Sequence, residues 1–280
     1  MRLFRPIIAF FLFTLIIISC KDDPKKYTES IGSQGDVKYL LKNDTLTAFM
    51  MGGVYTFQGY GGADKTFGLI KAEMKKSPGD DGFATDLEKV YEKLFEYPFH
   101  ISPKEKLDSR NVLKSWWDIS NEHEFHLLLT QLQDQGHEAL YEKCKAVLDA
   151  NGGMDADLDK IDYAKDSLTP DAKILLQFIK NNYRSFNPSG IKAWDLTRYI
   201  NVVCLGYSAE YIDRTTGINY ALSALKSARA VYPNWNKYYY DFVLGRKFWG
   251  GDTATDATYQ KLTTDMQKGD YSIYRYLPLK

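Results

Sequence analysis

The sequence predicts an all-α protein, built as a single multi-helix domain with an irregular, glycine-rich N-terminal part. Apolar residues recur at helical spacing through most of the chain. Residues that cap or stop helices separate these segments. We find no alternating strand pattern of useful length and no internal repeat. These three observations together favour helices packed on helices.

The chain begins with the features of a secretory signal peptide over residues 1–19. Two arginines precede the apolar run 7–18, and Ser19-Cys20 follows it. A run of about 12 residues is shorter than the roughly 20 that span a bilayer, which disfavours a permanent transmembrane helix. Residues 17–20 (IISC) resemble the lipobox that lipoprotein signal peptidase recognises. We therefore predict lipidation at Cys20, with an ordinary secretory signal as the alternative.

The residues after Cys20 bear on where the protein is located. Lys21-Asp22-Asp23 resembles the surface-export signal of lipoproteins in the Bacteroidota, although a solvated charged segment explains the same residues. The stretch 20–35 has the composition of a flexible tether. We expect a bacterial outer-membrane protein that contacts the membrane through its lipid anchor, and the export-like residues favour the outer face.

Residues 36–280 form the predicted helical domain, and their composition excludes some functions. The whole chain has 36 basic and 36 acidic side chains, so it carries no electrostatic footprint for nucleic acid. Cys144 and Cys204 lie in apolar helical patterns and are expected to be buried thiols, with a disulfide as the alternative. A domain boundary near Pro103 is conceivable, but we favour one domain.

The expected helices follow from their start and stop signals. The first segment, 37–70, begins with an apolar stretch that its glycines break up. Capping residues then open helices at Asn121, Thr169, Ser189, Thr215 or Thr216, and Asn234, and one more begins at His137. Stops follow for all of these helices except the one that opens at Thr169, and they are Gly136, Gly152-Gly153, Tyr211, Tyr232-Pro233 and Gly250-Gly251.

Three motifs approach a cofactor or metal site without completing it, so we predict neither. Residues 59–66 have the frame of a phosphate-binding loop, but Asp64 replaces its last glycine and would repel a nucleotide. Residues 155–166 have aspartates at calcium-loop spacing, but Lys160 replaces the glycine that makes the sharp turn. The histidines of 123–126 lack the spacing of a zinc-protease helix.

One polar cluster is the candidate site. The helix 191–212 is apolar on two opposite faces, so Asp195 and Arg198 are expected to be buried and, at i,i+3, to contact each other. In the helix 235–249, Arg246 lies among aromatic residues. A buried guanidinium needs a carboxylate, a ring face or a ligand anion, and Asp195 is the expected partner. The expected aromatic lining is Trp194, Trp235, Tyr239, Phe242 and Trp249.

Four motifs resemble a bacterial domain-of-unknown-function family, number 1266. They are 193–198 (AWDLTR), 244–249 (LGRKFW), 116–119 (WWDI) and 132–137 (LQDQGH). The resemblance covers residues of about 110–252. The family has no established activity, so the resemblance identifies the domain and implies no function.

Two functions remain open from the sequence. We favour a non-enzymatic envelope module that binds another envelope protein or a small anionic ligand at Asp195, Arg198 and Arg246. The alternative is a hydrolase that uses a carboxylate near Asp195, which needs a second carboxylate or a histidine within reach and an open cleft. A purely structural ion-pair network would explain the same residues.

Overall fold

The computed structural model describes residues 41–76, 82–97, 102–165, 168–169, 171–250 and 253–280. Within these ranges the regular structure is helical, and extended backbone pairs only in an isolated bridge between Asn187 and Gly190. The all-α prediction is confirmed. The predictions for residues 1–19, for the tether 20–35 and for Cys20 lie outside the described residues.

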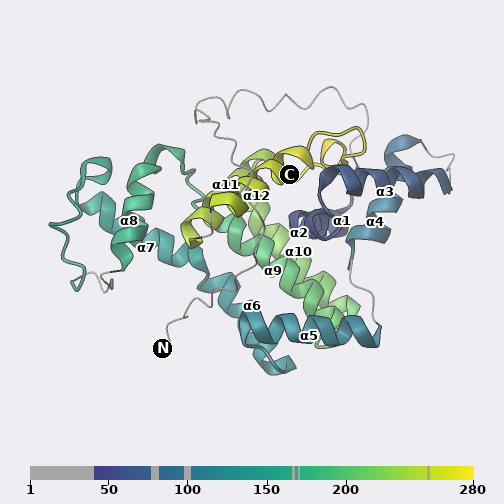
Figure 1. The fold of residues 1–280 in the computed structure, drawn as a ribbon, viewed down its shortest axis with the longest axis horizontal. Helices are drawn as coiled ribbons and strands as arrows, with labels where there is room; N and C mark the ends of the chain where they lie inside the picture. Colours follow the sequence, from purple (N-terminus) through teal and green to yellow (C-terminus); the bar gives the residue numbers. More distant parts are fainter. Residues whose placement is uncertain (1–40, 77–81, 98–101, 166–167, 170, 251–252) are drawn as a thin grey trace. The chain divides into compact units, whose positions relative to one another are not determined.

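The helices follow one another along the chain with short connections (Figure 1). In order they are α1 (Asp44–Met50), α2 (Gly53–Gly59), α3 (Ala63–Lys76), α4 (Phe83–Phe95), α5 (Pro103–Trp117), α6 (Glu122–Asp134), α7 (His137–Ala150), η2 (Gly153–Asp155), α8 (Ala172–Asn181), η3 (Tyr183–Ser185), α9 (Lys192–Ser208), α10 (Arg214–Val231), α11 (Trp235–Trp249), α12 (Thr253–Asp265) and η4 (Ile273–Arg275).

The predicted caps are correct in some places and wrong in others. Asn121 and Asn234 cap α6 and α11 by accepting hydrogen bonds from backbone amides three residues on. The cap of α10 is Asp213, two residues before the first predicted threonine and three before the second, because its carboxylate accepts from the Thr216 amide. Pro103 opens α5 after the Ser102 cap and marks no domain boundary.

The glycine-rich N-terminal part is more regular than predicted. It forms α2 and α3, and the turn between them uses the left-handed backbone of Gly61 and Gly62. Gly52 and Gly53 do not interrupt packing: a Cβ at Gly52 would collide with Ile200, and one at Gly53 with Tyr274. These glycines therefore allow close contact between elements, which a pattern of helix breakers does not reveal.

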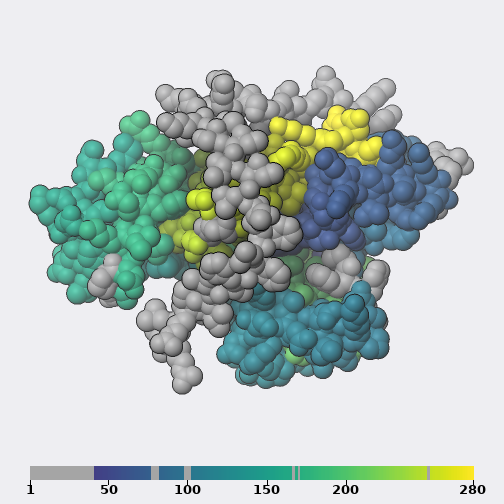
Figure 2. Space-filling view, in the orientation of Figure 1, coloured from purple at the N-terminus to yellow at the C-terminus, as the bar shows by residue number. Residues whose placement is uncertain are grey.

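Helix α9 lies at the centre of the main core. It packs against α5, α6, α7, α10 and α11, and thirteen of its residues are buried (Figure 1). This confirms the prediction from its two apolar faces. A second apolar cluster joins α7 and α8, whose residues gather in one teal-coloured lobe in the space-filling view (Figure 2). Cys144 and Cys204 are buried free thiols, as predicted.

Candidate functional site

The helices α7 and α9 cap each other at their N-termini. The Asp195 carboxylate, in the first turn of α9, accepts a 2.8 Å hydrogen bond from the backbone amide of Glu138 in α7. The Glu138 carboxylate in turn accepts a 2.6 Å hydrogen bond from the backbone amide of Ile191, the N-cap of α9. Each helix thus satisfies an unpaired amide of the other, and the Asp195 carboxylate places negative charge at the positive end of α7.

Two glycines make this reciprocal arrangement sterically feasible. A Cβ at Gly136, the N-cap of α7, would overlap the Asp195 carboxylate. A Cβ at Gly190 would overlap the Glu138 carboxylate, and Gly190 has a positive φ of 58°. The expected stop at Gly136 is therefore also the point where a second helix docks. We call the residues of this contact the α7/α9 junction: Gly136, His137, Glu138, Gly190, Ile191, Asp195 and Arg198.

The junction holds a carboxyl group that keeps its proton at neutral pH. Burial is the main cause that raises the pKa of Glu138 to about 8; the hydrogen bond from Ile191 opposes the shift, and the nearby carboxylates of Glu142 and Asp195 contribute to it. A second buried carboxyl, Asp241 on α11, has its pKa raised to about 6 by burial.

Asp241 explains why the predicted cap of α9 is wrong. Its carboxylate accepts hydrogen bonds of 2.6 Å from Asn187 and 2.7 Å from the Ser189 hydroxyl. Ser189 is therefore bonded to α11 and does not cap α9. The α9 amide of Ala193 instead donates to the Tyr232 hydroxyl at 2.8 Å.

The predicted contact between Asp195 and Arg198 is confirmed. Arg198 Nη1 lies 3.3 Å from Asp195 Oδ1 and donates to His137 Nδ1 at 2.7 Å. The guanidinium lies over the rings of Trp117 and Trp194, with its Cζ 4.6 and 5.0 Å from the ring centroids. His137, which the sequence indicated only as the start of a helix, is thus part of the cluster.

The expected pairing of Arg246 with Asp195 is wrong. Arg246 Nε lies 3.1 Å from Asp256 Oδ1, and its guanidinium lies 4.3 Å from the centroid of the Tyr259 ring. Asp256 and Tyr259 belong to α12, a helix that the pattern analysis did not identify. Gly245 faces α9, where a Cβ would overlap Trp194, so the next residue points about 100° away, toward α12. Arg246 is nevertheless buried, as predicted.

The predicted aromatic lining separates into two groups. Phe242 and Trp249 lie against Trp194, with ring centroids 5.6 and 5.8 Å away. The other two residues stabilise the C-terminal segment and α1: Trp235 Nε1 donates to the Leu277 carbonyl, and the Tyr239 hydroxyl donates to the carbonyl of Met50. Only the first group therefore belongs to the candidate site.

Tyr55 of α2 is a member of the site that the sequence analysis missed. Its ring centroid is 6.2 Å from those of both Phe242 and Tyr259. Its hydroxyl interacts electrostatically with Arg198 and Arg246, and burial raises its pKa well above the usual value, so the phenol stays protonated. No local pattern near Tyr55 indicates this role, because its partners lie more than 140 residues away in the chain.

This arrangement suits binding better than acid–base chemistry at Asp195. Both oxygens of Asp195 are engaged, and the residue is 3% exposed. His137 provides the second group within reach, 3.5 Å from Asp195 Oδ1, but Asp195 lines neither of the two surface pockets described below. The exposed side chains at its edge are Trp249, 47% exposed, and His137, 27% exposed.

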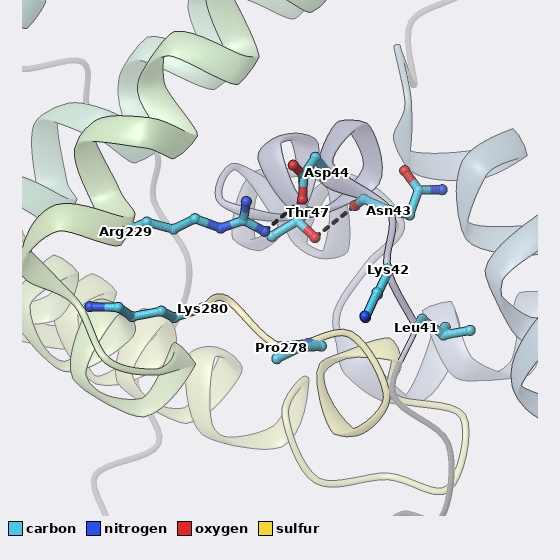
Figure 3. Close-up of a pocket in the computed structure, with 8 residues that line it drawn as sticks. All are labelled: Leu41, Lys42, Asn43, Asp44, Thr47, Arg229, Pro278 and Lys280. Carbon is cyan, nitrogen blue, oxygen red and sulfur yellow. Dashed lines mark hydrogen bonds and ion pairs between the residues drawn. The ribbon is translucent and has the colours of Figure 1, made fainter.

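Surface pockets lie elsewhere on the domain. One of about 590 Å³ lies between the start of α1, α10 and the C-terminal residues, where Arg229 donates to Asp44 at 2.7 Å (Figure 3). Its lining includes Lys42 and Lys280. Another, of about 640 Å³, is lined by His126, whose Nδ1 lies 2.8 Å from the Tyr220 hydroxyl.

The described residues contain neither a metal-binding cluster nor a membrane-spanning helix. No group of three or more His, Cys, Asp or Glu side chains is arranged to hold a metal ion. Among these same residues, no helix is both long and apolar enough to cross a bilayer.

Comparison with known proteins identifies the domain. No curated protein and no solved structure matches the chain. The family described as "Protein of unknown function (DUF1266)" matches residues 112–279, which extends past the motifs to include α12 and the Asp256 partner of Arg246. The match covers more than half of the chain, and this protein therefore belongs to the DUF1266 family.

Proposed function

We propose that this protein is a lipid-anchored, non-enzymatic binding module of the bacterial outer membrane that engages another envelope protein. The anchor is Cys20, and the binding face is the edge of the α7/α9 junction together with Trp249 of α11. The DUF1266 domain would then be the folded part that the tether 20–35 holds near the membrane.

The observation that carries the proposal is the set of side chains at this edge. Trp249 is half-exposed beside the buried Trp194, and Arg198 and His137 lie next to it with part of their side chains accessible. Tryptophan and arginine are enriched at the centres of protein–protein interfaces, where rings and guanidinium groups lose water together. The burial of Asp195, which is 3% exposed, supports binding over hydrolysis, because a catalytic carboxylate must be within reach of the substrate proton that it transfers.

The lipid anchor can be tested separately from the binding face. Metabolic labelling with a fatty acid should mark the wild-type chain but not a Cys20→Ala variant, which should remain as an uncleaved precursor or appear in the soluble fraction. Equal labelling of both proteins would contradict the anchoring proposal.

The binding face can be tested by cross-linking in intact cells. An envelope protein should be recovered with wild type and should be lost with Trp249→Ala. The matched control is Leu69→Ala on α3, because Leu69 is 45% exposed and lies outside the junction. Equal recovery with wild type and Trp249→Ala would exclude this face as the contact.

A further inference from the structure

Trp194 has a buried hydrogen-bond donor without a partner. The residue is 4% exposed, and within the described part of the chain its Nε1–H has no acceptor. Trp235 is equally buried, and its Nε1–H donates to the Leu277 carbonyl at 2.7 Å. Buried indole N–H groups in proteins normally have such an acceptor. The difference between these two tryptophans indicates that Trp194 is arranged to donate to something outside the described chain.

Further donors surround this indole. Arg198 Cζ lies 5.0 Å from the Trp194 ring centroid, and Phe242 lies against both Trp194 and Tyr55. The Tyr55 phenol stays protonated because burial raises its pKa, and it lies within electrostatic range of Arg198 and Arg246. Within the described residues no hydrogen bond engages this hydroxyl, and the residue is partly exposed. An indole N–H, a phenol O–H and two guanidinium groups are donors that an oxyanion satisfies.

The charges around the cluster favour a ligand with a single negative charge over one with two. Asp195 offsets the charge of Arg198, and Asp256 offsets that of Arg246. The cluster therefore has no net positive charge, and hydrogen bonds alone must stabilise a bound anion. Burying a dianion such as phosphate costs more than burying a monoanion, whose single charge can be stabilised by several donors. The rings of Trp194, Phe242, Tyr55 and Tyr259 provide apolar surface for an organic group attached to the anion.

We propose that an organic carboxylate binds between Arg198 and Arg246, accepting hydrogen bonds from Trp194 Nε1 and the Tyr55 hydroxyl. The half-exposed ring of Trp249, whose centroid is 5.8 Å from that of Trp194, covers this place and moves aside when the ligand enters. The inference rests on the proposed binding function and names the chemical group that the face recognises. It also brings α2, outside the family match, into the site.

The test uses the purified full-length protein in detergent and two probes that share a ring, benzoate and benzamide. Benzoate should raise the melting temperature in a concentration-dependent manner, because a ligand of the native state stabilises it, and neutral benzamide should not. Trp194→Phe and Tyr55→Phe each keep a ring and remove one donor, so each should weaken benzoate binding at least about tenfold. Trp235→Phe should bind benzoate as the wild type does.

Several results would overturn this proposal. They are equal shifts by benzoate and benzamide, unchanged benzoate affinity in Trp194→Phe, the absence of any benzoate shift, and a larger shift with inorganic phosphate than with benzoate. None of them depends on the cross-linking result, so the two proposals can fail separately. If benzoate also abolishes the cross-link that requires Trp249, the natural carboxylate belongs to the partner protein; if the cross-link persists, the ligand is a free organic acid.

Discussion

Replacing Asp195 by asparagine should destabilise the domain by breaking its ion pair with Arg198. The carboxylate is 3% exposed, and its Oδ1 lies 3.3 Å from Arg198 Nη1. Asparagine has nearly the same shape and still accepts the hydrogen bond that the Glu138 amide donates. The substitution therefore removes the charge and keeps the cap of α7.

The magnitude follows from the burial of Arg198. Removing one partner of a buried ion pair typically costs about 3–5 kcal/mol. The Arg198 side chain is 13% exposed and keeps its contacts with His137 and two indole rings, so we expect the lower end, about 3 kcal/mol. For a domain of this size the melting temperature should fall by roughly 6–12 °C. Asp195→Ala should cost about 1 kcal/mol more, because it also removes the cap.

The assay is a double-mutant cycle in denaturant. Asp195→Asn, Arg198→Met and the double variant should show a coupling energy above about 1 kcal/mol. A second cycle of Asp195→Asn with Arg246→Met should be additive within about 0.5 kcal/mol, since Arg246 pairs with Asp256. Additive effects in the first cycle, or strong coupling in the second, would refute this description of the cluster.

Three further predictions concern the stability of the fold. The pKa of Glu138 rises from 4.5 to about 8 on folding, so its contribution to the free energy of unfolding is full below pH 4.5 and is lost as pH rises through 8. Denaturation at several pH values should show this fall in stability, and Glu138→Gln should make the stability less dependent on pH. Gly245→Ala should lower the free energy of unfolding by about 1–3 kcal/mol, because the new Cβ overlaps Trp194. The control is Gly68→Ala on α3, whose Cβ meets no neighbour, so this change should be neutral or stabilising. Equal effects of the two substitutions in thermal melts would contradict this packing. Circular dichroism should show a helical spectrum that a chelator leaves unchanged, and a large loss of melting temperature on chelation would contradict a metal-independent fold.

The candidate site could be predicted only in part from the sequence. The burial of Asp195 and its contact with the largely buried Arg198 follow from a helix that is apolar on two faces, because i,i+3 neighbours are fixed by helix geometry. The partner of Arg246 does not follow from any local rule. A rotation of about 100° between Gly245 and Arg246 decides which helix each one meets, and the pattern of α11 does not specify its neighbours.

The sequence by itself determined the fold class and the placement of several helices, because caps and apolar periodicity act within a few residues. Only the tertiary structure decided that α7 and α9 cap each other, that Gly52 and Gly53 are packing positions, and that Tyr55 joins the cluster. These features depend on contacts between residues far apart in the chain. Such contacts are selected by how whole helix faces pack, and no segment of the sequence contains that information alone.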